Sequence, residues 1–206
     1  MEGSSLIQAQ NVTMTDNKSK DIVASGVSGN VVVHYESANL LPVYCLFACY
    51  EKDCTFHNDG TLEFHFSKEI KENIKKHFPK ADSVAIIRNP YEFITDVKAT
   101  IGTKCISDLV NYFELYGIDS PKGKVIDLQY FEYLTQDVPP QKVDGNLTYT
   151  FYDKYVYRSL LCKDVFFKNE QEYRFVLPND KIKKGTIYYI KPEQTISVVD
   201  LKEFFE

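Results

Sequence analysis

The stretch 167-FKNEQEYRFVLP-178 carries the strongest structural pattern in this chain. From Glu170 to Leu177 the side chains alternate in character, which is the period of a β-strand. One face of this strand consists of Gln171, Tyr173, Phe175 and Leu177, and the other consists of Glu170, Glu172, Arg174 and Val176. We expect the first face to pack in the core. The second is polar, and its two carboxylates lie about 7 Å apart at a rise of about 3.3 Å per residue.

Short apolar runs and a turn signal predict further strands. Residues 43–50 (VYCLFACY) and 83–88 (SVAIIR) are typical of strands that are buried on both faces. The sequence Asn58-Asp59-Gly60 predicts a turn, and the alternating strand at 61–66 that follows would form a hairpin with 43–50. Residues 186–191 and 196–199 predict two more strands, and 138–145 is the strongest loop signal.

Two amphipathic helices are predicted between these strands. Ser67 is the expected N-cap of the first, which ends before Pro79, and Asn89-Pro90 starts the second, which ends before Gly102. Residues 1–29 are polar and predict a flexible lead-in with one short strand at 5–10. The chain therefore predicts a single α+β domain over 30–206. Its sheet would be mixed and mainly antiparallel, with both helices on one face.

Composition and charge exclude several classes of protein. The 206 residues, 44% of them hydrophobic, are enough for one sizeable core. A net charge of −5 argues against a basic nucleic-acid-binding surface. No apolar run reaches the roughly 18 residues of a membrane-spanning helix, and the N-terminus lacks a signal-peptide pattern. We therefore expect a cytoplasmic protein without a membrane partner. We interpret the lysine-rich segment 68–80 as a solvated helix face with i, i+4 ion pairs.

Five scattered cysteines fit a reduced, cytosolic protein better than a disulfide framework. Cys45, Cys49, Cys54 and His57 are zinc-ligand types within one segment, but their spacing differs from that of a zinc knuckle. Cys45 and Cys49 are expected to pack as small hydrophobic residues, so we predict no metal site and leave metal binding by this segment open. Cys54 and His57 are the pair best placed for a nucleophilic role.

The carboxylates of the strand allow two interpretations. Glu172 and Arg174 pair with charges on neighbouring strands, as on an ordinary polar sheet face. Alternatively, Glu172 and Glu170 are catalytic as an acid–base or ribose-binding pair, with Lys163 and Arg174 as binding residues close by. The deciding observation is whether Glu170, Glu172 and Arg174 face a concave pocket.

The motif Lys163-x(6)-Glu170-x-Glu172-x-Arg174, with Phe167 before the strand, resembles the C-terminal signature of an uncharacterised bacterial family of prophages and mobile defence loci. Residues 43–48 and the segment SVAIIR-NP-YEF are similar to the middle region of that family. The resemblance implies a context of conflict between bacteria and phages, and it implies no particular reaction.

A weaker resemblance concerns NAD chemistry. The order Arg88, Thr148-x-Thr150, Glu170-x-Glu172 is similar to the Arg, Ser-x-Ser, Glu-x-Glu order of one class of ADP-ribosyltransferases. This implies that Arg88 contacts the NAD phosphates and that Thr148 and Thr150 brace the site. It further implies that Glu172 holds the ribose and that Glu170 serves the acceptor. Threonine stands where that class has serine at both positions.

Three functions follow from these observations. The leading hypothesis is a small accessory protein of bacterial or phage origin that acts in host–phage conflict by binding a protein partner, without a cofactor. The first alternative is an ADP-ribosyltransferase-like enzyme that uses NAD. The second is a non-catalytic structural or regulatory module. The sequence leaves open whether the protein is an enzyme.

Overall fold

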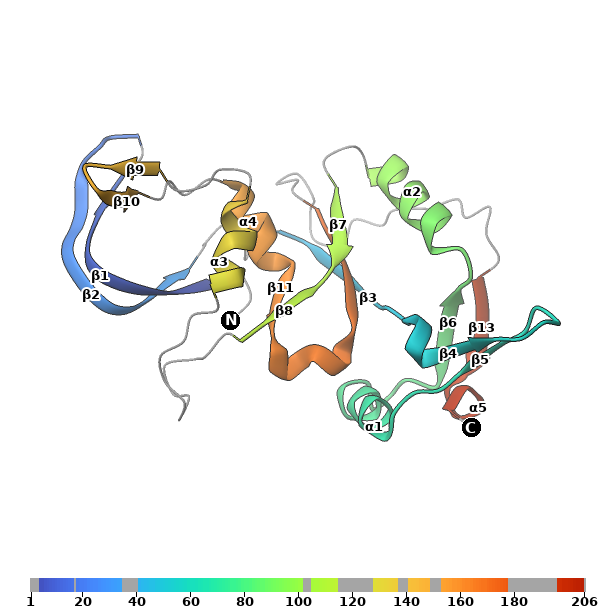
Figure 1. The fold of residues 1–206 in the computed structure, drawn as a ribbon. Helices are drawn as coiled ribbons and strands as arrows, with labels where there is room; N and C mark the ends of the chain where they lie inside the picture. Colours follow the sequence, from blue (N-terminus) through green and yellow to red (C-terminus); the bar gives the residue numbers. More distant parts are fainter. Residues whose placement is uncertain are drawn as a thin grey trace. The chain divides into compact units, whose positions relative to one another are not determined.

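The computed structural model describes residues 4–16, 18–34, 41–101, 105–114, 128–136, 141–148, 153–177 and 196–205. The chain forms two compact units, each assembled from two separated segments. Unit 1 contains Met1–Leu41 and Val110–Lys168, and unit 2 contains Pro42–Leu109 and Asn169–Glu206 (Figure 1). The predicted domain over 30–206 spans both. The predicted α+β class is confirmed, with strands that pair mostly antiparallel in several small sheets.

Unit 1 begins with a long antiparallel hairpin of β1 (Ser4–Thr15) and β2 (Ile22–His34). Its turn is closed by Asp16, whose carboxylate accepts hydrogen bonds from the backbone N–H groups of Lys18 and Ser19 at 2.8 and 2.7 Å. These strands are much longer than the predicted strand at 5–10. The polar composition, rich in serine and glycine, predicted a flexible segment, because these residues are not typical of strands.

Unit 1 has a second hairpin, formed by β9 (Gln141–Val143) and β10 (Asn146–Thr148). Asp144 and Gly145 between the strands have φ values of 49° and 83°. Positive φ at both central residues is the signature of a type I′ turn, for which Asp-Gly is a preferred pair. The loop predicted at 138–145 is therefore wrong at β9, while the turn at 144–145 agrees with it.

The rest of unit 1 surrounds a small core. Strand β8 (Asn111–Phe113) pairs in parallel with β11 (Cys162–Asp164), followed by the 3₁₀ helix η3 (Val165–Glu170), which crosses into unit 2. Helices α3 (Leu128–Thr135) and α4 (Asp153–Leu160) lie beside each other (Figure 1). The buried residues of this core are Tyr130, Leu134 and Cys162, with Phe113 and Tyr133 packed against them.

Unit 2 contains a three-stranded antiparallel sheet with β12 (Glu172–Val176) at its centre. Its outer strands are β3 (Val43–Phe47) and β7 (Ile106–Leu109). Helix α2 (Pro90–Ile101) packs on one face, where Phe93 and Val97 meet Phe175. As predicted, Asn89 caps the helix, its Oδ1 accepting the Glu92 N–H at 3.3 Å.

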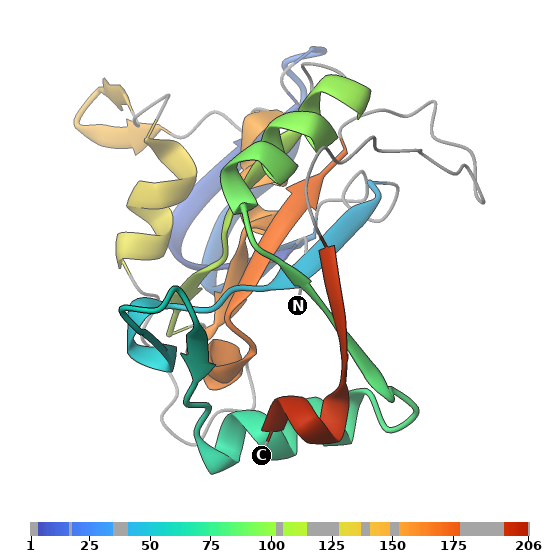
Figure 2. The same ribbon diagram turned by 90° about the vertical axis from the view of Figure 1, so that its right-hand side faces the viewer.

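The remaining elements of unit 2 include those that form a second, aromatic core. The remaining elements are η2 (Glu51–Asp53), β4 (Cys54–Phe56), β5 (Leu62–Phe64), α1 (Lys68–His77), β6 (Ser83–Ile87), β13 (Ile196–Asp200) and α5 (Leu201–Phe205). Ser67 caps α1 as predicted, accepting the Ile70 N–H at 3.3 Å. Phe66 and Ile70 are buried against Leu201 and Phe205, so that α5 lies alongside α1 (Figure 2).

Three details of the predicted arrangement are wrong. Helices α1 and α2 pack in different cores and not on one face of a single sheet. Strands β3 and β6 are not buried on both faces. Strand β3 is an outer strand with Tyr44 exposed, and β6 lies in a two-stranded sheet and has no buried residue. The hairpin turn at 58–60 is confirmed, but its first strand is β4 and not the apolar run at 43–50.

The predicted strand at 186–191 lies outside the described residues. No helix in the described ranges is long and apolar enough to cross a membrane.

Candidate functional site

The strand predicted to carry Glu170 and Glu172 starts two residues later than predicted. Glu170 is the last residue of η3, and β12 begins at Glu172. Gln171 between them has a φ of 42°, in the left-handed region that non-glycine residues rarely adopt. This turn breaks the alternation, so Glu170 and Glu172 are not successive residues on one face of a strand. The expected core face is confirmed for Phe175 and Leu177, which are buried in the α2 core.

Gln171 is held in this conformation by a buried set of hydrogen bonds. Its side-chain amide donates to the backbone carbonyl of Ala48 at 2.9 Å and to Oδ2 of the buried Asp53 at 2.8 Å. The Ala48 N–H donates back to the Gln171 carbonyl at 2.6 Å. Asp53 also accepts the Tyr50 N–H at 3.1 Å. Because both side chains are buried and paired, this set fixes the start of β12 relative to the end of β3.

Glu172 and Arg174 form a close ion pair within the strand. Arg174 Nε donates to Glu172 Oε2 at 2.6 Å, and the two side chains are only 2% and 14% exposed for Arg174 and Glu172, respectively. The register places Arg174 beside Asp108 on β7 and Cys45 on β3. Charged side chains this deeply buried are found paired, because unpaired burial of a charge is very costly. The pair therefore lies inside the protein and not on a solvated sheet face.

Glu170 has a different neighbour. Its carboxylate lies 3.8 Å from Nδ1 of His77 on α1, and the adjacent Asn169 donates to Glu69 on the same helix at 3.4 Å. Glu69 and His77 are two helical turns apart, so they belong to one face of α1. Glu170 therefore contacts α1, whereas Glu172 contacts Arg174 on its own strand.

The other predicted binding residues are distributed over the chain. Arg88 is exposed and directly follows β6 in unit 2. Lys163 belongs to β11 in unit 1, with its ammonium group 4.8 Å from the ring centre of Phe167, which is within cation–π range. Thr148 is the last residue of β10 in unit 1, and Thr150 lies outside the described residues. The roles that the NAD resemblance implies for these residues stay predictions.

The cysteine-rich segment is not a cluster of soft ligands. No group of three or more His, Cys, Asp or Glu side chains suited to a metal ion occurs in the described part of the chain. The predicted burial of Cys45 and Cys49 is wrong, because both are exposed. Nevertheless, partial desolvation, followed in importance by the charges of Asp53 and Cys54, raises the pKa of the Cys49 thiol to about 12. Such a thiol is a poor nucleophile.

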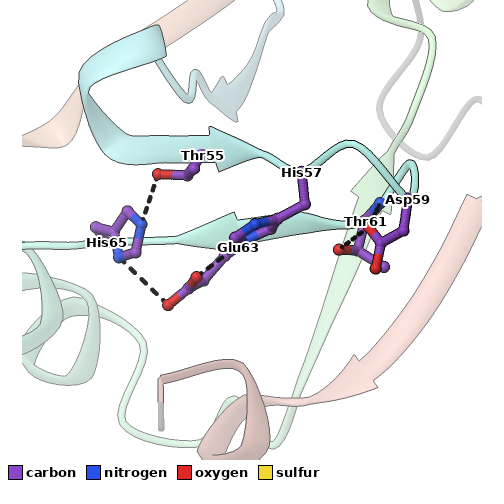
Figure 3. A network of polar contacts seen from close by, with 6 residues as sticks. All are labelled: Thr55, His57, Asp59, Thr61, Glu63 and His65. Atoms are coloured by element: carbon purple, nitrogen blue, oxygen red, sulfur yellow. Dashed lines mark hydrogen bonds and ion pairs between the residues drawn. The ribbon is translucent and has the colours of Figure 1, made fainter.

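His57 bonds to a carboxylate in place of a thiol. Figure 3 shows the polar face of the β4–β5 hairpin, where His57 Nε2 lies 3.0 Å from Glu63 Oε2. The other carboxylate oxygen of Glu63 is 3.8 Å from His65 Nδ1, and His65 Nε2 hydrogen-bonds to the Thr55 hydroxyl at 2.8 Å. Glu63 is therefore held between two imidazoles, one directly after β4 and one directly after β5.

The turn of this hairpin is also ordered by a carboxylate. Asp59 Oδ1 accepts hydrogen bonds from the Thr61 hydroxyl at 2.6 Å and from the Thr61 N–H at 2.9 Å (Figure 3). These bonds lower the pKa of Asp59 below its usual value, the hydroxyl contributing most. Gly60 has a φ of 82°, which favours glycine at this position of the turn.

The opposite face of the hairpin is apolar and exposed at its outer end. Phe56 and Leu62 are cross-strand partners, with 75% and 39% of their surfaces exposed. One step further along, Phe64 stacks on the buried Phe66 with ring centres 5.6 Å apart. The hairpin thus extends the aromatic core of unit 2 outward into an exposed apolar edge. We call Phe56 and Leu62 the hairpin edge. The alternation at 61–66 already contained this signal.

Comparison with known proteins adds no further assignment, because no family model, curated protein or solved structure matches the chain.

Proposed function

We propose that this chain is a small accessory protein that acts by binding a partner protein, and that the hairpin edge is part of the contact surface. The observation that carries the proposal is the exposure of Phe56 and Leu62 as a cross-strand pair on an ordered hairpin. Large aromatic and aliphatic side chains that are held in place before binding serve as anchors in protein interfaces.

The polar face supports this function by ordering the hairpin. Glu63 is bound to His57 and His65 on one side of the ribbon, while the apolar pair lies on the other. An isolated two-stranded hairpin is only marginally stable. The side-chain bonds and the continuation into the Phe64–Phe66 core limit the conformations that the free hairpin must give up on binding.

The geometry of the carboxylates favours binding over catalysis. Glu172 is engaged by Arg174 at 2.6 Å, and Gln171 separates it from Glu170. A catalytic pair of carboxylates requires two groups that act on one bound substrate. The hypothesis of an ADP-ribosyltransferase-like enzyme gains no support from this arrangement. The motif that ends in Glu170-x-Glu172-x-Arg174 supports a role in host–phage conflict through resemblance, and its residues would serve the fold.

In the test, a photo-crosslinking amino acid replaces Phe56 in a bacterial host challenged with phage, and a second protein carries it at Tyr91. Tyr91 on α2 is also strongly exposed, which makes it a matched control. We expect the crosslinker at position 56 to capture one specific protein, and the crosslinker at position 91 not to capture that protein. Leu62→Ser should remove the adduct and any phage-dependent phenotype. The same adducts from both positions, or none from position 56, would contradict the proposal.

A further inference from the structure

A second exposed surface lies at the C-terminal end of α1, and it does not include the hairpin edge. Residues 75–80 contain three lysines and no acidic residue, in a chain whose net charge is −5. The sequence predicted i, i+4 ion pairs along this helix. In the described structure the helix has one, between Lys68 and Glu72 at 3.7 Å in its first turns. We call Lys75, Lys76, Phe78 and Lys80 the basic end of α1.

Phe78 is the apolar centre of this surface. It is the C-cap residue of α1, where its N–H donates to the Ile74 carbonyl at 2.8 Å. The next bond of the turn joins the Ala81 N–H to the Phe78 carbonyl at 3.0 Å. The backbone is therefore ordered on both sides, yet 62% of Phe78 is exposed. A large aromatic residue held in a rigid turn but outside the core is typical of an anchor for a partner.

The lysines around Phe78 differ in what they contact. Lys75 Nζ lies 5.9 Å from the ring centre of Phe205, which is within cation–π range. Lys76 and Lys80 are exposed, and the described contacts of the chain include no carboxylate for either. Lysine near a helix C-terminus interacts favourably with the helix dipole, which explains Lys75 and Lys76. That effect fades within the last turn and does not explain Lys80 or the exposure of Phe78.

We propose that the basic end of α1 docks an acidic segment of a protein partner, whose carboxylates face Lys76 and Lys80 and whose apolar side chain covers Phe78. Charge complementarity selects an anionic ligand. A short acidic peptide fits better than a nucleic acid, because the overall negative charge repels a long polyanion and the surface has no arginine. A single aromatic residue is also a small anchor for a membrane surface, which typically needs a larger apolar face.

The test is selection of peptides of about 12 residues from a random displayed library on the full chain. We expect enriched peptides to combine Asp or Glu with Leu or an aromatic residue, and to bind more weakly as salt rises. In fluorescence anisotropy, Lys76→Glu/Lys80→Glu should weaken binding of an enriched peptide by at least about tenfold. Phe78→Ser should also weaken it. The charge-matched control Lys18→Glu/Lys142→Glu, at exposed positions of unit 1, should leave it unchanged.

Several outcomes would overturn the inference. The first is that the library yields no enriched peptide or only neutral peptides. The second is that the control variant loses as much peptide binding as Lys76→Glu/Lys80→Glu. The third is that a single-stranded oligonucleotide or phosphatidylserine vesicles bind more tightly than any selected peptide. Circular dichroism verifies that each variant is folded. Phe56→Ser/Leu62→Ser should retain peptide binding, so failure of the hairpin proposal and failure of this inference are distinguishable.

Discussion

The buried pair of Glu172 and Arg174 gives the sharpest prediction from the fold. Arg174 lies on the central strand β12 with 2% of its side chain exposed, and Glu172 accepts its Nε–H at 2.6 Å. Replacing Glu172 by alanine removes this carboxylate and leaves the guanidinium in place. The guanidinium cannot lose its charge by deprotonation in a protein. Unfolding should therefore become markedly easier.

The size of the effect follows from the burial. Removing one partner of a buried ion pair costs about 3–5 kcal/mol, whereas an exposed pair contributes about 0–1 kcal/mol. Because Glu172 retains 14% exposure, we expect Glu172→Ala to lower the free energy of unfolding by about 3 kcal/mol, at the lower end of the buried range. In a double-mutant cycle with Arg174→Met, the two losses should fall short of additivity by about 2 kcal/mol.

Urea denaturation at neutral pH measures these free energies, and Lys68→Ala is the matched control. Lys68 and Glu72 form an exposed pair at 3.7 Å, so this change should cost less than about 0.5 kcal/mol. Moderate salt should alter the Glu172–Arg174 coupling little, because buried charges are poorly screened. A loss below about 1 kcal/mol for Glu172→Ala, with an additive double variant, would refute the reasoning.

Three further predictions concern single residues. Since the pKa of Cys49 is raised to about 12, iodoacetamide at pH 8 should alkylate it roughly 1,000-fold more slowly than in urea, and equal rates would contradict the assignment. Thr61→Val should raise the pKa of Asp59 toward 3.8 in an NMR titration. Because the pKa of Asp59 is lower in the folded than in the unfolded state, ionised Asp59 stabilises the fold at pH values above its unfolded pKa. This contribution is lost as the pH falls through the folded pKa, so Thr61→Val should lose less stability on acidification than the unaltered protein. Gln171→Ala should destabilise more than Gln171→Gly, by about 1 kcal/mol in urea melts, because alanine keeps the left-handed strain.

The elements that the sequence predicted well are those whose ends are encoded locally. Ser67 and Asn89 each accept an N–H of the first helical turn, so a single residue type marks where α1 and α2 start. The amphipathic spacing behind each cap then identifies the buried face, as in Phe93 and Val97. Neither signal depends on the rest of the chain.

The features that sequence reasoning missed depend on distant partners. The left-handed turn at Gln171 persists because Asp53 and Ala48, more than 110 positions earlier in the chain, hold its amide. No local sequence pattern predicts the turn at Gln171, so the alternation from Glu170 onward was interpreted as one continuous strand. The hairpin around Asp144-Gly145 is different, because this residue pair is itself a local signal for a type I′ hairpin turn.

The position of Gln171 also constrains any catalytic use of the carboxylates. For Glu170 and Glu172 to act on one ribose, both must project from the same side of an extended strand, which requires Gln171 to leave the left-handed region. Its amide would then release Asp53, whose carboxylate is buried and would lose one of its donors. Removing a hydrogen-bond donor from a buried polar group costs about 1–3 kcal/mol, although the Tyr50 N–H would remain bonded to Asp53. The same hydrogen bonds that define the start of β12 therefore oppose the geometry that the NAD hypothesis needs, and they favour a structural role for this motif.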